Sequence, residues 1–328
     1  MTRTAPSEAP VTVEPDTTRS RRWLTPAILA VVAVVLALAP MFLAPFATST
    51  LSRILVFGLL AVSLDLLVGV SGLPSLGHAA YFGIGAYAAG WVSINVTSAI
   101  PAPLLVGAVA GAVGAALTGW ITVRAHGVFF LMLTLAIGEL LHQLAQTWET
   151  VTGGANGMAG IPPARVGSEP LLLSGYIYWY VFAAFVVGFV IVWIVSRSPF
   201  GAALRGIRDN EPRMRALGYP TRIYKYAVFV FAGSIAGMAG ALLAAQQRLV
   251  TPADLGFATA ALALLAVIIG GAGTLWGPVL GAALVIIIRD AIGPSLDGHG
   301  ALLLGLVFIA VVYVLPRGAA GILRRRRQ

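Results

Sequence analysis

Cysteine is absent from this chain of 328 residues, which excludes disulfides and thiolate metal sites. The four histidines form no close ligand pair, so the sequence predicts neither a metal nor another bound cofactor. Lysine occurs once, at Lys225, and no glycine-rich loop ends in Gly-Lys followed by Ser or Thr. A phosphate cradle of that type cannot form, so any ATP hydrolysis that drives this protein takes place on another chain.

Charge is also scarce. Charged residues make up 10% of the sequence, whereas about 25% is typical of soluble globular domains. Hydrophobic residues make up 59%, and the mean hydropathy is +0.91. These values predict an all-α, polytopic membrane protein that lies in a lipid bilayer. The net charge of +9 does not indicate a nucleic-acid site, because the basic residues are scattered between apolar runs and are typical of topology signals.

The apolar runs predict about ten transmembrane helices, each close to the ~20 residues that a bilayer requires. A cleavable signal peptide is the alternative for the first run. We favour a span there because the run from Trp23 to Phe46 approaches full length and another run follows at once. The third and ninth runs are short, which is compatible with a tilted or partly re-entrant segment. The predicted spans are 26–46, 51–70, 79–96, 103–123, 128–146, 176–195, 223–246, 257–275, 277–292 and 301–316.

The basic residues predict that both termini are cytoplasmic. With a cytoplasmic N-terminus, 17 of the 21 Lys and Arg residues fall on the inner side, as the positive-inside rule requires. The membrane domain then covers 23–316, between a polar, disordered tail (1–22) and a basic tail (317–328). The four basic residues outside the inner segments are Arg53, Arg165, Arg248 and Arg289.

Glycine and proline interrupt the apolar region between residues 69 and 90. Gly72, Pro74 and Gly77 argue against a continuous helix, because glycine costs helix stability and proline lacks a backbone donor. In lipid, the freed backbone groups must be buried in protein or line a watery cavity. The sequence therefore predicts a broken or re-entrant segment, which is a candidate for a transport path. The alternative is a tight loop before an ordinary span with a close-packing glycine face.

A second glycine pattern resembles the first one. Gly270 and Gly273 have the spacing of Gly69 and Gly72, and each pair follows a span of the same predicted direction. A duplicated ancestor would explain this repeat, and so would the high glycine content of the chain.

Several ionisable side chains lie inside predicted spans, where charge is costly and usually faces a cavity or a partner. Asp65 lies in the second span, and Glu139 and His142 lie at i, i+3 spacing in the fifth. The alternative for the last two is a structural hydrogen-bonded pair near the outer surface. Arg289 and Asp290 are neighbours in sequence, so we expect them to point to different faces and to seek partners elsewhere.

Two longer segments lie outside the spans. The outer segment, 147–175, is rich in glycine and asparagine, which permit left-handed turns, and forms either a cap over an outer mouth or a flexible connector. In the inner segment, 196–222, Phe200, Leu204 and Ile207 have helical spacing, with Pro199 as a start signal and Gly218 and Pro220 as stop signals. A short amphipathic helix there suits docking to a partner protein. The alternative is a basic helix that lies on anionic lipid.

Taken together, several stretches resemble the LivM-type permease of branched-chain amino acid ABC transporters. The resemblance covers roughly residues 50–320 in order, which makes it more specific than any single motif. The stretches are Ser71–Tyr87, Arg124–Glu139, Thr152–Gly157, 198–218, Ile269–Gly281 and Gly305–Gly318.

The resemblance implies an importer subunit of the bacterial inner membrane. Its partners would be a LivH-type permease subunit, two cytoplasmic ATP-binding subunits and an extracytoplasmic substrate-binding protein, with alternating access as the mechanism. A hydrophobic amino acid needs polar contacts at its charged groups, and the helix start near Gly77 offers backbone N–H groups for a carboxylate. The predicted substrate path comprises Ser71, Ser75, His78, Tyr81, Phe82, Tyr87, Thr134 and Glu139. For His78, an anchoring role at the start of the new helix is the favoured interpretation.

The same resemblance implies that 196–222 is the loop that couples the permease to an ATPase. This loop departs from the general importer pattern of Glu-Ala-Ala and a spaced glycine, because it offers Gly201-Ala-Ala and a separate Glu211. The predicted ATPase contacts are Phe200, Gly201, Leu204, Arg205, Ile207, Arg208, Asn210 and Glu211. The predicted outer gate comprises Thr152, Gly153, Gly154 and Asn156.

Three other functions stay open on the residues alone. A urea or short-chain amide permease of the same superfamily has a similar sequence. A proton-coupled carrier would use Asp65 or Glu139 and need no ATPase. An intramembrane protease would use the Gly-x-Ser-Gly string at 69–72, with Ser71 as nucleophile and His126 or His142 as base.

Overall fold

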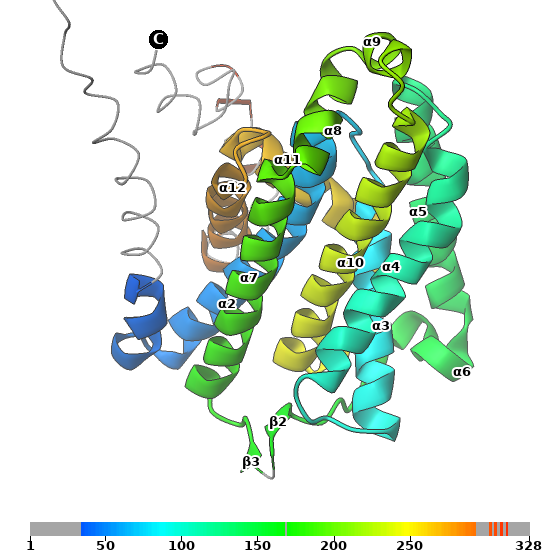
Figure 1. Ribbon diagram of the computed structural model, residues 1–328. Coiled ribbons are helices and arrows are strands. Elements are labelled where there is room, and N and C mark those ends of the chain that lie inside the picture. Colours follow the sequence, from blue (N-terminus) through cyan, green and yellow to red (C-terminus); the bar gives the residue numbers. More distant parts are fainter. Residues whose placement is uncertain are drawn as a thin grey trace, which may run out of the picture. The chain divides into compact units, whose positions relative to one another are not determined.

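The computed structural model describes residues 34–167 and 169–292, together with 302, 303, 305, 306, 309, 310 and 313 (Figure 1). Residues 1–43 form one unit, of which 34–42 are helical, and residues 44–328 form a second. The predicted tails 1–22 and 317–328 lie outside the described residues, as do parts of the first and last predicted spans. All the elements named below belong to the second unit.

This unit is built from helices, which confirms the all-α class. Within the described residues, strands occur only as two antiparallel pairs of two-residue segments, in which β1 (Met158–Ala159) pairs with β4 (Leu249–Val250) and β2 (Arg165–Val166) with β3 (Glu169–Pro170). The helices are α2 (Pro45–Asp65), η1 (Leu66–Val70), α3 (His78–Asn95), α4 (Ala102–Thr122), α5 (Val128–Thr147), α6 (Glu149–Thr152), η2 (Gly154–Asn156), α7 (Ser174–Arg197), α8 (Pro199–Asp209), α9 (Glu211–Ala216), α10 (Thr221–Gln247), η3 (Pro252–Asp254), α11 (Phe257–Gly270), α12 (Trp276–Ile286) and η4 (Ile287–Ile292).

Within the described residues, six helical segments are long and apolar enough to cross a membrane. They are Pro45–Val70, Ala102–Thr122, Val128–Thr147, Ser174–Arg197, Thr221–Gln247 and Pro252–Gly270. Each coincides with a predicted span. The third and ninth predicted spans correspond to α3, with 18 residues, and to α12, which has 11 residues and continues as the π-helix η4. The total of ten spans stays a prediction.

Helix α10 packs against α2, α3 and α4 (Figure 1). Small residues permit this packing, as is usual between membrane helices. A Cβ atom on Gly237 would clash with the carbonyl of Gly107 and lie 2.8 Å from Cα of Gly111, so α4 and α10 meet backbone to backbone. Helix α4 therefore buries a small face and turns its large side chains outward.

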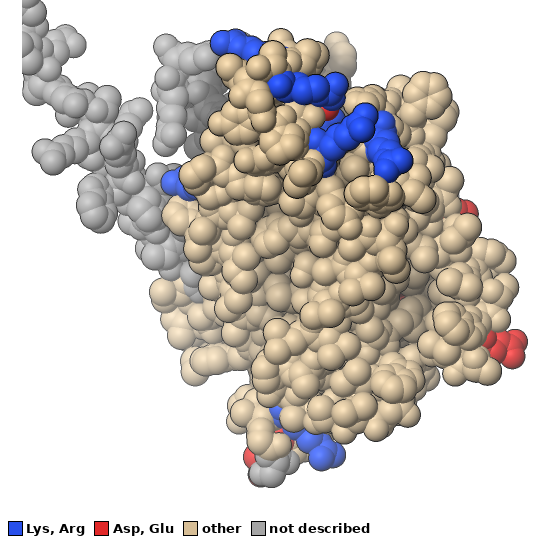
Figure 2. All heavy atoms as spheres, turned by 45° about the vertical axis from the view of Figure 1, so that its right-hand side comes forward, with Lys and Arg blue, Asp and Glu red and all other residues tan. Residues whose placement is uncertain are grey.

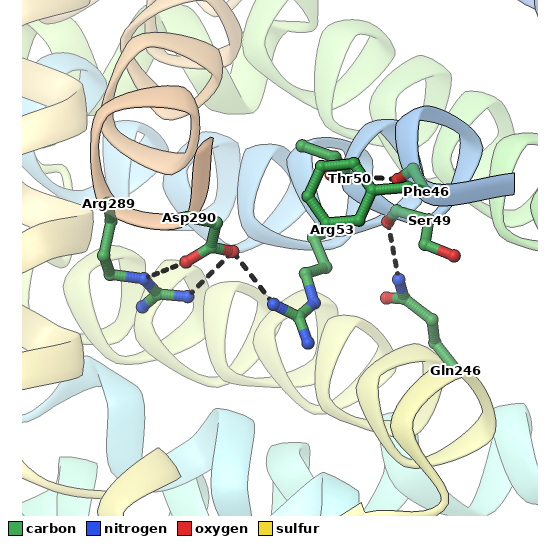
Figure 3. Close-up of polar contacts among 7 residues, drawn as sticks. All are labelled: Phe46, Ser49, Thr50, Arg53, Gln246, Arg289 and Asp290. Carbon is green, nitrogen blue, oxygen red and sulfur yellow. Dashed lines mark hydrogen bonds and ion pairs between the residues drawn. The ribbon is translucent and has the colours of Figure 1, made fainter. Parts of the chain in front are cut away.

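Polar contacts tie the start of α2 to η4 and α10 (Figure 3). Asp290 accepts hydrogen bonds from Arg53 Nη1 at 3.0 Å and from Arg289 Nε at 2.7 Å, while Gln246 Nε2 donates to the carbonyl of Ser49 at 2.9 Å. The expectation for Arg289 and Asp290 was therefore only half right. Asp290 finds a distant partner in Arg53, but the long Arg289 side chain also folds back onto its neighbour.

Candidate functional site

The chain between α2 and α3 leaves the helical conformation at the predicted place. The π-helix η1 widens the last turn of α2, and residues 71–77 then continue as irregular backbone, with Gly72 at φ +71°. Within this segment, the backbone N–H of Leu76 donates to Thr134 Oγ1 at 3.3 Å, and Gly77 packs against Gly138. Thr134 and Gly138 lie inside the candidate span of α5, so this first break lies at the depth of a membrane helix.

Buried polar atoms gather where α3 begins. His78 is fully buried, and its Nε2 lies 2.9 Å from Ser63 Oγ. The Ser63 hydroxyl donates to the carbonyl of Leu60 at 2.7 Å, which leaves the histidine as the donor in the first contact. This bond anchors the start of α3 to α2. In the described part of the chain, His78 Nδ1 and the Ser75 hydroxyl are buried without a hydrogen-bond partner.

A second break, residues 271–275 between α11 and α12, lies directly against the first. Asp65 is fully buried, and its carboxylate accepts hydrogen bonds from the backbone N–H groups of Gly273 at 2.6 Å and Leu275 at 3.0 Å. A Cβ atom on Gly69 would clash with Gly273, so the two glycine motifs of the sequence are in contact. Asp65 thus satisfies backbone donors that a broken helix leaves unpaired, as irregular backbone away from water requires.

Helices α8 and α9 form the basic end of this unit. The Ser198 side chain caps α8 by accepting from the backbone N–H of Gly201, and Pro199 occupies the first turn as predicted. Leu204 and Ile207 are buried within the chain, so α8 has no free apolar face with which to lie on lipid. Figure 2 shows Lys and Arg side chains gathered over this end, above a broad surface without charge. The predicted single helix is in fact two, because Asn210 ends α8 and caps α9.

One carboxylate holds this end together. Glu211 forms ion pairs with Lys225 and, at 2.8 Å, with Arg215, and it accepts from the Thr221 hydroxyl at 3.1 Å. His126 Nε2 lies 3.8 Å from the same carboxylate. Burial tends to raise the pKa of Glu211, but the hydrogen bond and charge of Lys225, with help from Thr221 and Arg215, bring that pKa below its ordinary value of 4.5. Glu211 is therefore ionised at neutral pH.

A polar cleft of about 380 Å³ connects this end with the first break. Its walls come from four parts of the chain: the break at 71–73, the turn at 125–127, residues 207–212, and Lys225 of α10. Ser71 contributes to the wall, but its hydroxyl donates to the carbonyl of Leu67 at 2.8 Å. A nucleophilic serine would instead need a base as its partner.

Helix α5 carries polar side chains on an exposed face. The Glu139 side chain is 55% exposed and lies 3.3 Å from His142 Nδ1, and Gln146 Nε2 lies 2.9 Å from His142 Nε2. Glu139, Gln143 and Gln146 follow one another at steps of four and three residues, so they lie on one face of the helix. We call these three residues the α5 polar stripe. Sequence reasoning found only Glu139 and His142, although the same spacing also identifies Gln143 and Gln146.

The structure distributes the predicted path residues unequally. Glu139 is exposed, whereas the other seven are buried in this conformation: Ser71, Ser75, His78, Tyr81, Phe82, Tyr87 and Thr134. The hydroxyl groups of Tyr81 and Thr118 form a hydrogen bond with an O–O distance of 2.6 Å. Of the eight predicted path residues, Glu139 on the α5 polar stripe is thus the one that faces outward.

The predicted outer gate lies in an ordered segment. The Thr152 hydroxyl bonds the carbonyls of Ala145 at 2.6 Å and Trp148 at 2.7 Å, which fixes α6 to the end of α5. Pairing of β1 with β4 joins the same segment to the end of α10. Thr152 and Gly154 are buried, whereas Gly153 and Asn156 are exposed. The segment is therefore a structured cover of these helix ends, and its role as an outer gate stays a prediction.

The predicted ATPase contacts also divide by exposure. Arg208 and Asn210 are exposed, whereas Phe200, Arg205 and Glu211 are half-buried and Gly201, Leu204 and Ile207 are buried. Arg205 Nη1 donates to the carbonyl of Ser196 at 2.6 Å, and Arg208 donates to the carbonyl of Gly69. The surface of the loop that is free for a partner is thus smaller than the predicted set.

The fold and these two breaks define a class, an α-helical membrane protein with irregular backbone inside its spans. Residues 46–312 match the family described as "Branched-chain amino acid transport system / permease component". The chain belongs to this family, which confirms the resemblance seen in the sequence.

Individual relatives agree with this assignment. The chain is 29% identical to the high-affinity branched-chain amino acid transport system permease protein LivM of Salmonella typhimurium, over 80% of this chain and 67% of the relative. LivM of Escherichia coli is 28% identical over the same shares. The autoinducer 2 import system permease protein LsrC of Salmonella paratyphi B is 27% identical over 58% of this chain and 55% of the relative. No solved structure matches the chain.

Membership in the family fixes the general role. The protein is the permease component of an ABC transport system in the bacterial inner membrane, and it is a transport subunit and not an enzyme. The family implies partner ATPases and a substrate-binding protein. The protease and the proton-coupled carrier are therefore set aside. The geometry agrees, because the Ser71 hydroxyl and the Asp65 carboxylate are both engaged with backbone groups.

Proposed function

We propose that this chain is the permease subunit of an importer for branched-chain or other hydrophobic amino acids. The observation that carries the proposal is the match to LivM proteins over 80% of the chain, against 58% for the LsrC proteins. A LivH-type permease would be its membrane partner. The membrane domain would comprise ten spans over 23–316, with the basic end and the tails 1–22 and 317–328 in the cytoplasm.

The substrate path would run along the α5 polar stripe. A carboxylate and two amides on the outside of a membrane helix are costly in lipid, so they require water or a protein partner. A path between α5 and a second permease subunit supplies both. Glu139 would meet the ammonium group of the cargo, and the buried polar atoms of Ser75 and His78 would become available when the first break moves.

The ATPase would dock on the exposed part of the basic end. Arg213, Arg215 and Arg222 are exposed there, together with the apolar side chains of Leu217 (66% exposed) and Ile223 (66% exposed). Such a mixture of arginine and large apolar side chains is typical of the centre of a protein interface. Of the predicted contacts, Asn210 would border this surface, and the outer gate at 152–156 would lie on the opposite side.

The test is ATP-driven uptake in proteoliposomes that contain this chain with the permease and ATPase subunits that co-purify with it. The proposal predicts uptake of leucine, isoleucine or valine that requires ATP and the binding protein. Uptake of urea or short-chain amides instead would show that the cargo assignment is wrong. If no ATPase co-purifies with the chain and transport requires only a proton gradient, the proposal is contradicted.

A further inference from the structure

The side chain of Arg208 joins the basic end to the first break. Its guanidinium group, on α8, donates to the main-chain carbonyl of Gly69, which belongs to the π-helix η1. Carbonyls at a helix end lack partners within the helix, and this one is satisfied from a different element. A π-helix inside a membrane span is itself uncommon and often marks a functional site.

The contact is close because Gly72 makes room for it. A Cβ atom on Gly72 would lie 2.5 Å from Arg208 Cγ and 3.3 Å from Arg208 Cβ. Gly72 also has φ +71°, a conformation that other residues adopt at a cost. The stem of Arg208 therefore packs over the point at which the chain leaves the helix, and its head group binds three residues earlier.

The first break is itself in direct contact with the second. Gly69 lies against Gly273, and Asp65, one turn before Gly69, binds the N–H groups of Gly273 and Leu275. Leu275 has φ +60°, so the second break depends on Asp65 to hold an unfavourable backbone conformation. Contacts thus run without a gap from α8 through Arg208, Gly69 and Asp65 to residues 271–275.

We propose that Arg208 is the positioning residue that transmits movement of α8 to both membrane breaks. This inference rests on the proposed function, because the movement of α8 comes from an ATPase docked on the basic end. Asp209, whose side chain is 66% exposed, holds the same guanidinium at 2.9 Å and lies where a docked partner can reach it. A partner that binds Asp209 alters its ion pair with Arg208 and thereby the position of the Arg208 side chain. Because Arg208 also binds Gly69, the two breaks then move with it.

The test replaces Arg208 in the reconstituted importer and measures ATP hydrolysis and uptake together. Arg208→Met keeps an unbranched apolar stem over Gly72 but removes every donor, and Arg208→Lys restores one charged donor. Arg165→Met, which removes a positive charge from an exposed position in β2, outside the basic end, is the matched control. We expect Arg208→Met to retain the ATPase and its basal hydrolysis while uptake per ATP falls at least about fivefold. Arg208→Lys should recover part of the uptake, and Arg165→Met should keep the parent ratio.

A second readout separates coupling from simple stability. The chain has no native cysteine, so a spectroscopic label on Ala272→Cys reports only on the second break. In the parent, the signal should change when nucleotide binds to the ATPases, and in Arg208→Met that change should disappear.

Three results would overturn the inference. They are a parent-like transport ratio in Arg208→Met, an unchanged response of the label at 272, and loss of the ATPase itself, which would make Arg208 a docking residue. If no ATPase co-purifies with the unmodified chain, the proposed function itself is refuted.

Discussion

Helices α4 and α5 are equally exposed in this chain but expose different chemistry. In each, 22% of the most apolar stretch is buried, against 89% for the α2 segment. Helix α4 exposes a large aliphatic side chain at every fourth residue: Leu105, Val109, Val113 and Leu117. Helix α5 turns out Phe129 and Leu140 on one side and the α5 polar stripe on another.

The difference indicates two kinds of surroundings. A face of large aliphatic side chains is compatible with lipid. The small residues of α4 are already packed against α10. A face with Glu139 and two amides does not, because polar groups in hydrocarbon cost free energy unless they are paired. Equal exposure in one subunit therefore predicts a lipid face on α4 and an inward face on α5 in the complex.

A glutamate placed on each face should give the largest difference. Val113→Glu puts a carboxylate into lipid at a cost of about 3 kcal/mol and should strongly reduce the amount of inserted protein. Gln143→Glu adds the same charge to the α5 polar stripe and should leave that amount close to the parent level. The measurement is the yield of monodisperse protein extracted from membranes, and equal losses would remove the distinction.

The backbone contacts of α4 are predicted to tolerate an added methyl group less well than its contacts with side chains. Gly237→Ala on α10 forces a methyl group against the backbone of α4 and should lower the free energy of unfolding by about 2 kcal/mol. Gly114→Ala is the control, because its methyl group meets side chains and no backbone: the flexible end of Ile84 at 2.9 Å and the Tyr81 ring at an ordinary 3.5 Å. Thermal unfolding in detergent compares them. Similar melting temperatures would show that the close approach of α4 and α10 is not needed.

Two glutamates separate stability from transport. Glu211 has its partners within the chain, so Glu211→Gln should lower stability by about 2 kcal/mol at neutral pH. Because the folded pKa of Glu211 is lowered, its stabilisation is present above the unfolded pKa and is lost as the pH falls through the folded value. The difference in melting temperature between parent and variant should therefore shrink below about pH 4.5. A constant difference down to pH 3 would contradict this assignment.

Glu139→Gln should behave in the opposite way. Its carboxylate has one partner in the described chain, His142, and is expected to meet cargo, so stability should hold while uptake falls about tenfold. Glu149→Gln, an exposed glutamate on α6, is the control and should transport normally. If Glu139→Gln unfolds more easily and transports at the parent rate per folded molecule, the structural-pair interpretation is correct.

The smallest effect is expected at Ser71. Its hydroxyl donates to the carbonyl of Leu67, four residues earlier in η1, so Ser71→Ala should change uptake less than twofold. Abolished function would return attention to the Gly-x-Ser-Gly string.

The sequence predicts elements of this protein better than contacts between them. The break after residue 70 follows from Gly72, Pro74 and Gly77, and the start of α8 follows from Pro199, because these residues act locally. The pairing of Asp65 with Gly273 could not be foreseen, since it joins positions 208 residues apart. Leu204 and Ile207 were recognised as an apolar face, but helical spacing does not tell whether a partner or the chain itself covers that face.

The central claim, that the transport path runs along α5, is tested most directly by labelling of single cysteines in the assembled importer. A membrane-impermeant maleimide should react with Gln143→Cys, and loaded binding protein should change the rate, while Val113→Cys in lipid should stay unreactive. Equal reactivity at the two positions, or a reactive Val113→Cys beside an inert Gln143→Cys, would contradict the account.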